Sequence, residues 1–154
     1  MKAFELSEKR LSKTEKLQRI HEVLQKVGLS ASEVLGRYPH QLSGGQLQRF
    51  LIARVLLIKP EVLIADEITS MIDASSRAGI LNLLMDLRDK EGLSLLFITH
   101  DIGQAQYISD EILVMNKGEI VETGNVNEVL TKPKNEYTKQ LLSCVPSIET
   151  TWKL

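Results

Sequence analysis

The first sixty residues carry apolar side chains at helical spacing, interrupted by capping and stop signals. Two S-x-x-E capping boxes each precede such a segment, which predicts a helix between Ser12 and Gly28 and a short one between Ser30 and Gly36. A third periodic run predicts a helix from about Gly45 to Ile58, and Pro60 stops it. This part of the chain is therefore predicted to be helical.

The pattern changes after Pro60. Two short apolar runs, "VLIAD" at Val62–Asp66 and "SLLFITH" at Ser94–His100, have the length and composition of buried strands. Between them, Asp73 can cap a helix that ends at Gly92. Two buried strands joined by a helix predict a parallel pair with a right-handed crossover, and ligands of such sheets bind beyond the carboxyl ends of the strands.

The last third predicts smaller elements. Asp101 can cap a short helix, and "EILVMNKGEIVE" at residues 111–122 predicts a hairpin that turns at Lys117 and Gly118. Two small helices should begin at Asn125 and Asn135. The fold class predicted is α/β, with a helical piece at residues 1–59 and the C-terminal part of a core at 60–154, closed by the hairpin and helices.

Composition excludes several classes of protein. The chain has 154 residues, 43% hydrophobic and 25% charged, and a formal net charge of -1, so no nucleic-acid partner is predicted. Its one cysteine, Cys144, excludes an internal disulfide and fits a reducing compartment. Apolar runs are too short to span a membrane, and the charged start lacks a signal-peptide core. We predict a cytoplasmic protein that reaches a membrane only through a partner.

"LSGGQLQR" places its serine and two glycines where a helix begins. Free backbone N–H groups and the positive end of the helix dipole favour an anion there. Gly44 and Gly45 would let a phosphate approach the backbone, and the hydroxyl of Ser43 would add a donor. The alternative is a plain serine cap followed by a glycine turn. The tripeptide alone favours this alternative, whereas the whole segment, taken with the motifs that follow it, favours the phosphate site.

Both predicted strands end in polar residues that suit phosphate chemistry. After the first, Asp66 can hold Mg²⁺ and Glu67 can orient or deprotonate an attacking water. After the second, His100 can hydrogen-bond a γ-phosphate. The alternatives are ordinary ones, because strands often end in solvated acids and a lone histidine is more often structural.

The order and spacing of these segments resemble the ATP-binding subunits of ABC transporters. "LSGGQLQR" resembles the signature motif, "VLIADE" Walker B, "SMID" the D-loop and "FITHD" the H-loop. The resemblance implies ATP and Mg²⁺ as cofactors and an α/β, P-loop NTPase-like fold. It assigns catalytic roles to Glu67 and His100, and a metal role to Asp66. Nucleotide contacts are implied for the signature and the D-loop, at Ser43, Gly44, Gly45, Gln46 and Asp73.

Some positions depart from the family pattern. Ile68 stands where a proline usually follows the acid pair, Met71 and Ile72 replace the common Ala-Leu, and Leu47 replaces a frequent polar residue. The charged and phosphate-facing positions are intact, so we expect altered loop stiffness more than altered chemistry.

The P-loop pattern Gly-x-x-x-x-Gly-Lys-Ser/Thr does not occur, since no two of the nine glycines lie five residues apart. The Q-loop and the aromatic adenine contact are missing as well, so the chain resembles the C-terminal half of an ABC ATPase subunit. In that family two subunits pair head to tail, and each signature faces ATP held by the other's P-loop. The resemblance thus implies that "LSGGQ" serves a partner's nucleotide, whereas Asp66, Glu67 and His100 serve a nucleotide bound by their own P-loop.

Further resemblance favours one branch of the family. "RYPHQLSGGQ" and "PKNEYTKQLLSCVP" resemble oligopeptide and dipeptide importers. This implies a second ATPase subunit and transmembrane permease subunits as partners, and a position on the inner face of the cell membrane. Two alternatives stay open: a non-catalytic module that lends its signature to a complete ATPase, and a shortened product without independent activity. Whether the chain alone is an enzyme is left open. A soluble ABC protein of translation or DNA repair fits less well, because no basic stripe is present.

Overall fold

The computed structural model describes residues 12–70 and 72–144. The predictions that fall on the charged N-terminus, on Met71 and on the last two residues of the tail motif, Val145 and Pro146, lie outside the described residues. The described chain forms two compact units, Met1–Leu96 and Phe97–Leu154. This division does not test the predicted boundary after residue 59, which stays a prediction.

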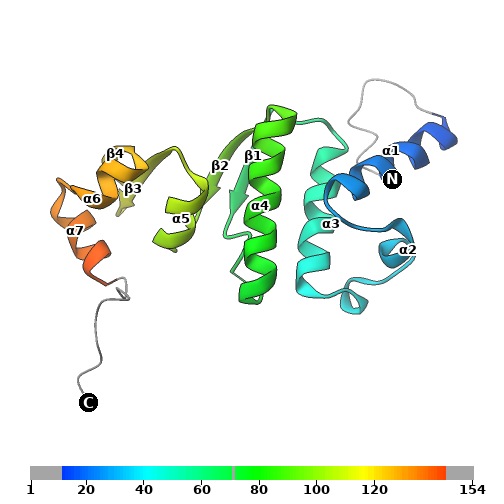
Figure 1. Ribbon diagram of the computed structural model, residues 1–154, viewed down its shortest axis with the longest axis horizontal. Helices are drawn as coiled ribbons and strands as arrows, with labels where there is room; N and C mark the ends of the chain where they lie inside the picture. The colour runs from blue at the N-terminus through cyan, green and yellow to red at the C-terminus, as the bar shows by residue number, and fades with distance from the viewer. Residues whose placement is uncertain (1–11, 71, 145–154) are drawn as a thin grey trace, which may run out of the picture. The chain divides into compact units, whose positions relative to one another are not determined.

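The helical predictions for the first sixty residues are confirmed (Figure 1). α1 (Lys13–Lys26) begins in the predicted capping box, where the Glu15 N–H donates to Ser12 Oγ over 3.3 Å and the Ser12 N–H donates to the Glu15 carboxylate over 2.7 Å. α2 (Ala31–Val34) and a 3₁₀ turn, η2 (Pro39–Gln41), lead to α3 (Gly44–Leu56). Val23, Leu24 and Val27 of the first helical segment are buried.

The predicted strand-helix-strand order is also confirmed. β1 (Val62–Asp66) and β2 (Ser94–Ile98) are hydrogen-bonded neighbours in one parallel sheet, joined by α4 (Ala74–Glu91). α4 ends at Gly92, which takes the left-handed conformation with φ 69°. Its inner face carries buried apolar residues, among them Ile80, Leu81, Leu84 and Leu87.

The predicted burial of the two strands is wrong on one side of β1 and along β2. In β1, Leu63 and Ala65 are only 6% and 2% exposed, whereas Val62 and Ile64 are 57% and 63% exposed. β2 alternates in the same way between half-buried and exposed residues. A parallel strand is buried on both faces only when layers pack on both, and the described residues leave one face of these strands uncovered.

The second unit holds the predicted hairpin and three short helices, α5 (Ile102–Ile108), α6 (Val126–Thr131) and α7 (Glu136–Ser143). β3 (Glu111–Asn116) and β4 (Glu119–Asn125) pair antiparallel, with a bulge between Val114 and Met115. Lys117 and Gly118 form the turn with φ 51° and 85°, as a tight two-residue hairpin loop requires. The side chains of Asn125 and Asn135 cap α6 and α7, as predicted.

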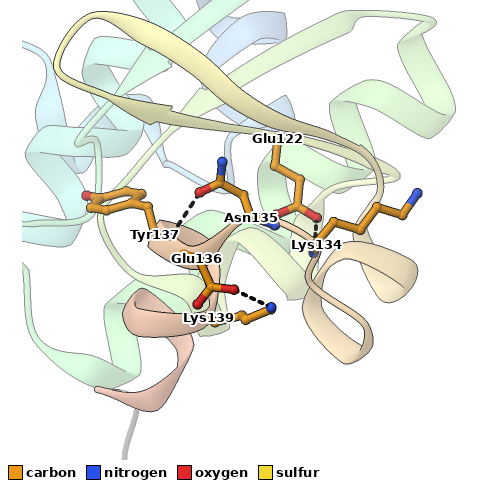
Figure 2. Close-up of polar contacts among 6 residues, drawn as sticks. All are labelled: Glu122, Lys134, Asn135, Glu136, Tyr137 and Lys139. Atoms are coloured by element: carbon orange, nitrogen blue, oxygen red, sulfur yellow. Dashed lines mark hydrogen bonds and ion pairs between the residues drawn. The ribbon is translucent and has the colours of Figure 1, made fainter.

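A network of hydrogen bonds around the Glu122 carboxylate connects β4 to α7 (Figure 2). The Glu122 carboxylate accepts hydrogen bonds from the backbone N–H groups of Lys134 and Asn135, over 2.8 and 3.1 Å. The Asn135 side chain in turn accepts from the Tyr137 N–H over 2.8 Å and so starts α7. The Lys134 N–H, followed by the Thr138 hydroxyl, lowers the pKa of Glu122. Strand β4 thereby anchors the segment that leads into α7.

Candidate functional site: the starts of two packed helices and the acids after β1

The first turn of α3 is fixed by a capping box within the "LSGGQ" segment. The Gln46 N–H donates to Ser43 Oγ over 3.2 Å, and the Ser43 N–H donates to Gln46 Oε1 over 3.1 Å. Both Ser43 and Gln46 were predicted as nucleotide contacts, and the structure gives each a structural task as well. Because a hydroxyl has two lone pairs and one proton, Ser43 still has its O–H to donate.

The two glycines of the segment differ in their surroundings. Gly44 is exposed, whereas Gly45 is buried, and a Cβ on Gly45 would lie 2.9 Å from Ser76 Oγ in α4. A side chain at Gly45 would therefore force Ser76 or one of the two helices to shift. The backbone N–H groups of Gly44 and Gly45 have no acceptor within α3, because the N–H groups in the first turn of any helix lack an intrahelical partner. The helix start thus offers close-set donors on a glycine backbone, as the sequence predicted.

Asp73 starts α4 beside this segment. Its carboxylate accepts from the Ser76 N–H over 2.9 Å and from Ser75 Oγ over 2.5 Å. These hydrogen bonds, the one from the Ser75 side chain first, hold the pKa of Asp73 well below its ordinary value. Figure 1 shows α3 and α4 running side by side, and Gly45 touches the first turn that Asp73 caps. The structure therefore brings the signature segment and the residues after Asp73 together.

The predicted acids lie in the turn that follows β1. Asp66 is exposed at the end of the strand, and Glu67 is half-buried with φ 48°, which is uncommon for a residue other than glycine. The Ser70 N–H and hydroxyl both donate to the Glu67 carbonyl, over 3.1 and 2.8 Å, and hold this turn. Such strained backbone is often found at functional sites. The roles assigned to these two acids stay predictions.

His100 follows β2 and is exposed in the second unit. The next residue, Asp101, caps α5 as predicted, because its carboxylate accepts from the Gln104 N–H over 3.1 Å. The Asp101 N–H donates to Thr99 Oγ1 over 3.0 Å, so a local network shapes the chain on both sides of the histidine. The catalytic role of His100 stays a prediction.

The donor set fits a nucleotide with its magnesium ion. Free N–H groups at the start of a helix of 13 residues suit phosphate oxygens. Within residues 12–70 and 72–144, no three His, Cys, Asp or Glu side chains gather to hold a metal. Magnesium in phosphate sites normally keeps water and phosphate oxygens and takes only one or two carboxylates. One exposed carboxylate such as Asp66 therefore matches this ion when phosphate supplies other ligands.

Sequence reasoning missed Arg49. Its Nη1 donates to the Val27 carbonyl over 2.8 Å, and its Nη2 donates to the Gly79 carbonyl over 3.1 Å. Arg49 lies four residues after Gly45, on the side of α3 that also carries the buried Ile52 and Ala53. That spacing was the signal that could have found it, because it places a charged residue within an otherwise buried stripe.

α3 begins with N–H groups suited to phosphate and packs on α4, the helix that follows β1 and the two acids at its end. This arrangement fits an α/β fold of the P-loop NTPase class. The family model described as ABC transporter matches residues 2–70. The predicted resemblance to the ATP-binding domains of ABC transporters is confirmed. The described residues contain no helix with the length and apolar character needed to cross a bilayer.

Curated relatives carry names of one branch. The chain is 45% identical over 139 residues to the dipeptide transport ATP-binding protein DppF of Haemophilus influenzae. This alignment covers 90% of the chain and 42% of that protein. It is 47% identical over 135 residues to the oligopeptide transport ATP-binding protein OppF of Bacillus subtilis, covering 88% and 44%. The chain thus spans less than half the length of these relatives.

A solved structure supports the same fold. The dimeric structure of the ATP-binding cassette MJ0796 in a post-hydrolysis state, bound to ADP and Pi, superposes with a TM-score of 0.69 at 30% identity. The match covers 80% of this chain and 53% of that one. The predicted fold class, α/β of the P-loop NTPase type with parallel strands, is confirmed.

Proposed function

We propose that this chain provides the signature part of an ABC ATPase site in a peptide importer. The observation that carries the proposal is the start of α3, where the box between Ser43 and Gln46 fixes two glycine N–H groups at a helix N-terminus. These donors would contact phosphate oxygens of ATP held by the P-loop of a second ATPase subunit. Permease subunits would carry the solute and place the chain on the cytoplasmic face of the membrane.

The residues after the strands would act on a nucleotide bound by a P-loop joined to this chain's own core. ATP and Mg²⁺ supply the scissile phosphoanhydride and the countercharge. Asp66 would hold the ion, directly or through water, and Glu67 would orient and deprotonate the attacking water. His100 would donate a hydrogen bond to the terminal phosphate. With such a P-loop the subunit would hydrolyse ATP.

The solute class rests on the relatives. Two relatives that align with most of this chain are named for dipeptide and oligopeptide transport. The pairing with a second ATPase subunit is supported by the dimeric state of the solved cassette. We therefore propose oligopeptides or dipeptides as the transported class and a homo- or heterodimer of ATPase subunits.

A second candidate function is a non-catalytic module that lends its signature to a complete ATPase. The 154 residues contain no pair of glycines with P-loop spacing. In that case Asp66, Glu67 and His100 would have no nucleotide to act on, while the start of α3 would keep its role. Both candidates share the trans role of the signature.

To test that role, the purified chain is mixed with a form of the Bacillus subtilis relative that binds ATP but does not hydrolyse it. We expect MgATP to produce a mixed complex in size-exclusion chromatography with light scattering. Ser43→Arg should abolish the complex, because it puts bulk where the phosphate docks. Ser12→Arg is the matched control, since Ser12 caps α1 with the same box outside the signature.

Two results would contradict the proposal. One is a mixed complex that Ser43→Arg and Ser12→Arg affect equally. The other is a stoichiometric, low-micromolar MgATP site on the isolated chain in titration calorimetry, because the P-loop normally provides most phosphate contacts.

A further inference from the structure

Arg49 occupies a position where helix α3 faces its neighbours. It follows Gly45 by four residues and precedes Ile52 by three, and both of these residues are buried. Residues at this spacing share one side of a helix. A charged side chain on such a stripe requires hydrogen-bond partners, because burying an unpaired charge is strongly unfavourable.

The guanidinium of Arg49 finds these partners in two other helical segments. Nη1 donates to the carbonyl of Val27, the C-cap residue that follows α1, and Nη2 donates to the carbonyl of Gly79, inside α4. The planar fork of arginine can reach two acceptors at once, which the single ammonium of lysine does less well. Arg49 thereby joins the helix that carries the signature to α1 and to α4.

Two glycines leave room for the guanidinium. A Cβ on Gly79 would lie 2.8 Å from Nη2, and a Cβ on Gly28 would lie 3.3 Å from Nη1. Glycine inside a helix is unfavourable relative to alanine, so the presence of Gly79 in the first half of α4 calls for a reason. Contact with Arg49 supplies one.

Arg49 and the signature glycine Gly45 both contact α4, at neighbouring turns. Gly45 meets Ser76, and Arg49 meets Gly79, so two positions one turn apart on α3 face two positions one turn apart on α4. At the far end of α4, Lys26 of α1 pairs with Glu91 over 2.5 Å. A second, solvent-exposed contact therefore joins α1 to α4 at the far end of α4.

We propose that Arg49 is a positioning residue: by tying α3 to the carbonyls of Val27 and Gly79, it holds the Gly44 and Gly45 N–H groups in the orientation that a phosphate needs. This inference rests on the proposed trans role of the signature. Arg49 itself donates to backbone carbonyls and not to the nucleotide, so it acts through the helix start.

The experiment uses two variants that disturb the same contact from opposite sides. Arg49→Lys keeps the charge but loses the fork. Gly79→Ala keeps Arg49 but pushes Nη2 away from its carbonyl, and alanine should favour the helix. Arg54→Lys is the matched control, because Arg54 is an exposed arginine on the same helix. Circular dichroism first checks that all three variants unfold like the unchanged protein.

Two readouts separate this inference from the proposed function. The amide resonances of Gly44 and Gly45 in ¹⁵N spectra report the helix start without any nucleotide. The MgATP-dependent complex with the Bacillus subtilis relative reports its use. We expect Arg49→Lys and Gly79→Ala to shift both resonances and to weaken the complex roughly tenfold, as loss of a charged hydrogen bond would, while Arg54→Lys does neither.

The outcomes are distinct. If the resonances shift but even the unchanged protein forms no complex, the positioning by Arg49 is supported and the proposed function fails. The inference is overturned if Arg49→Lys and Gly79→Ala behave like the control Arg54→Lys, with unchanged Gly44 and Gly45 resonances and an unchanged affinity of the complex.

Discussion

The start of α3 and the strand β1 both carry predicted site residues, yet they are supported in opposite ways. Around α3 every polar support lies within the first unit: Ser43 and Gln46 bond each other, Gly45 packs on Ser76, and Arg49 bonds two neighbouring segments. β1 instead leaves the side of Val62 and Ile64 open while Leu63 and Ala65 are covered. The signature is supported by contacts inside the described chain, whereas the described residues cover only one side of the strand that leads to the acids.

This difference matches the proposed division of labour. A surface that meets another subunit's nucleotide has to be complete on its own chain before that subunit arrives. Acids that serve a P-loop on the same core depend on the layer that holds that P-loop. The apolar face of β1 is where such a layer would pack, because parallel strands are normally covered on both faces.

The largest effect is expected from Glu67→Gln in a reconstituted subunit, made by joining the chain to the P-loop half of the Bacillus subtilis relative. Hydrolysis of ATP should fall by about 10²–10⁴-fold, because the amide keeps the shape of the side chain but cannot accept the proton of water. ATP binding should persist. Steady-state phosphate release and nucleotide titration measure the two quantities.

Ser43→Arg in the same subunit sharpens the comparison. It should also reduce hydrolysis, but by preventing the closed dimer, so size-exclusion chromatography with ATP should show a dimer for Glu67→Gln and a monomer for Ser43→Arg. Equal dimerisation of both variants would contradict the trans role of the signature.

Two neighbouring substitutions in β1 test the open face directly. Leu63→Ala should lower the free energy of unfolding by about 2–5 kcal/mol, because it leaves a cavity against the covered face. Ile64→Ala should cost less than about 1 kcal/mol, since the side chain is largely exposed and only strand propensity is lost. Urea unfolding of the isolated chain measures both.

The result would change the picture if Ile64→Ala were as costly as Leu63→Ala. That outcome would mean that the open face is covered in solution, and a dependence of the unfolding midpoint on protein concentration would then identify self-association.

Local patterns could be predicted from the sequence because their partners lie within one turn. The capping residues Ser12, Ser43 and Asp73 each bond a backbone N–H three residues further on. The glycine turn of the hairpin, at Gly118, follows from the same kind of short-range rule. Such elements need no knowledge of the rest of the fold.

Contacts between distant residues could not be read in this way. The exposure of Ile64 depends on which layers cover the sheet, and an apolar run alone predicts burial. The place of Arg49 on an apolar stripe could not be predicted, because the two carbonyls that accept its hydrogen bonds lie 22 and 30 residues away in the chain. The roles of Asp66, Glu67 and His100 came from the family resemblance, and local structure shows only the turn that presents the two acids.

The cap of α4 offers the smallest effect and a test by pH. Hydrogen bonds from Ser75 and Ser76 depress the pKa of Asp73 below its ordinary value of 3.8. A carboxyl with a depressed pKa in the folded state stabilises the fold above the pKa it has when unfolded, and this contribution is lost as pH falls below about 4. Asp73→Asn keeps a good capping residue, so it should change stability only slightly at pH 7.

The effect of Asp73→Asn should instead appear in how steeply the urea midpoint of unfolding falls as the pH is lowered. Between pH 5 and about pH 2, the urea midpoint of the unchanged protein should fall more steeply than that of Asp73→Asn, because only the former binds a proton at this cap on unfolding. Ser75→Ala removes the largest cause of the lowered pKa while leaving the Ser76 N–H bond in place. Its fall should be intermediate. If the urea midpoints of all three proteins fall in parallel with pH, the hydrogen bonds that the Asp73 carboxylate accepts at the start of α4 do not stabilise the fold.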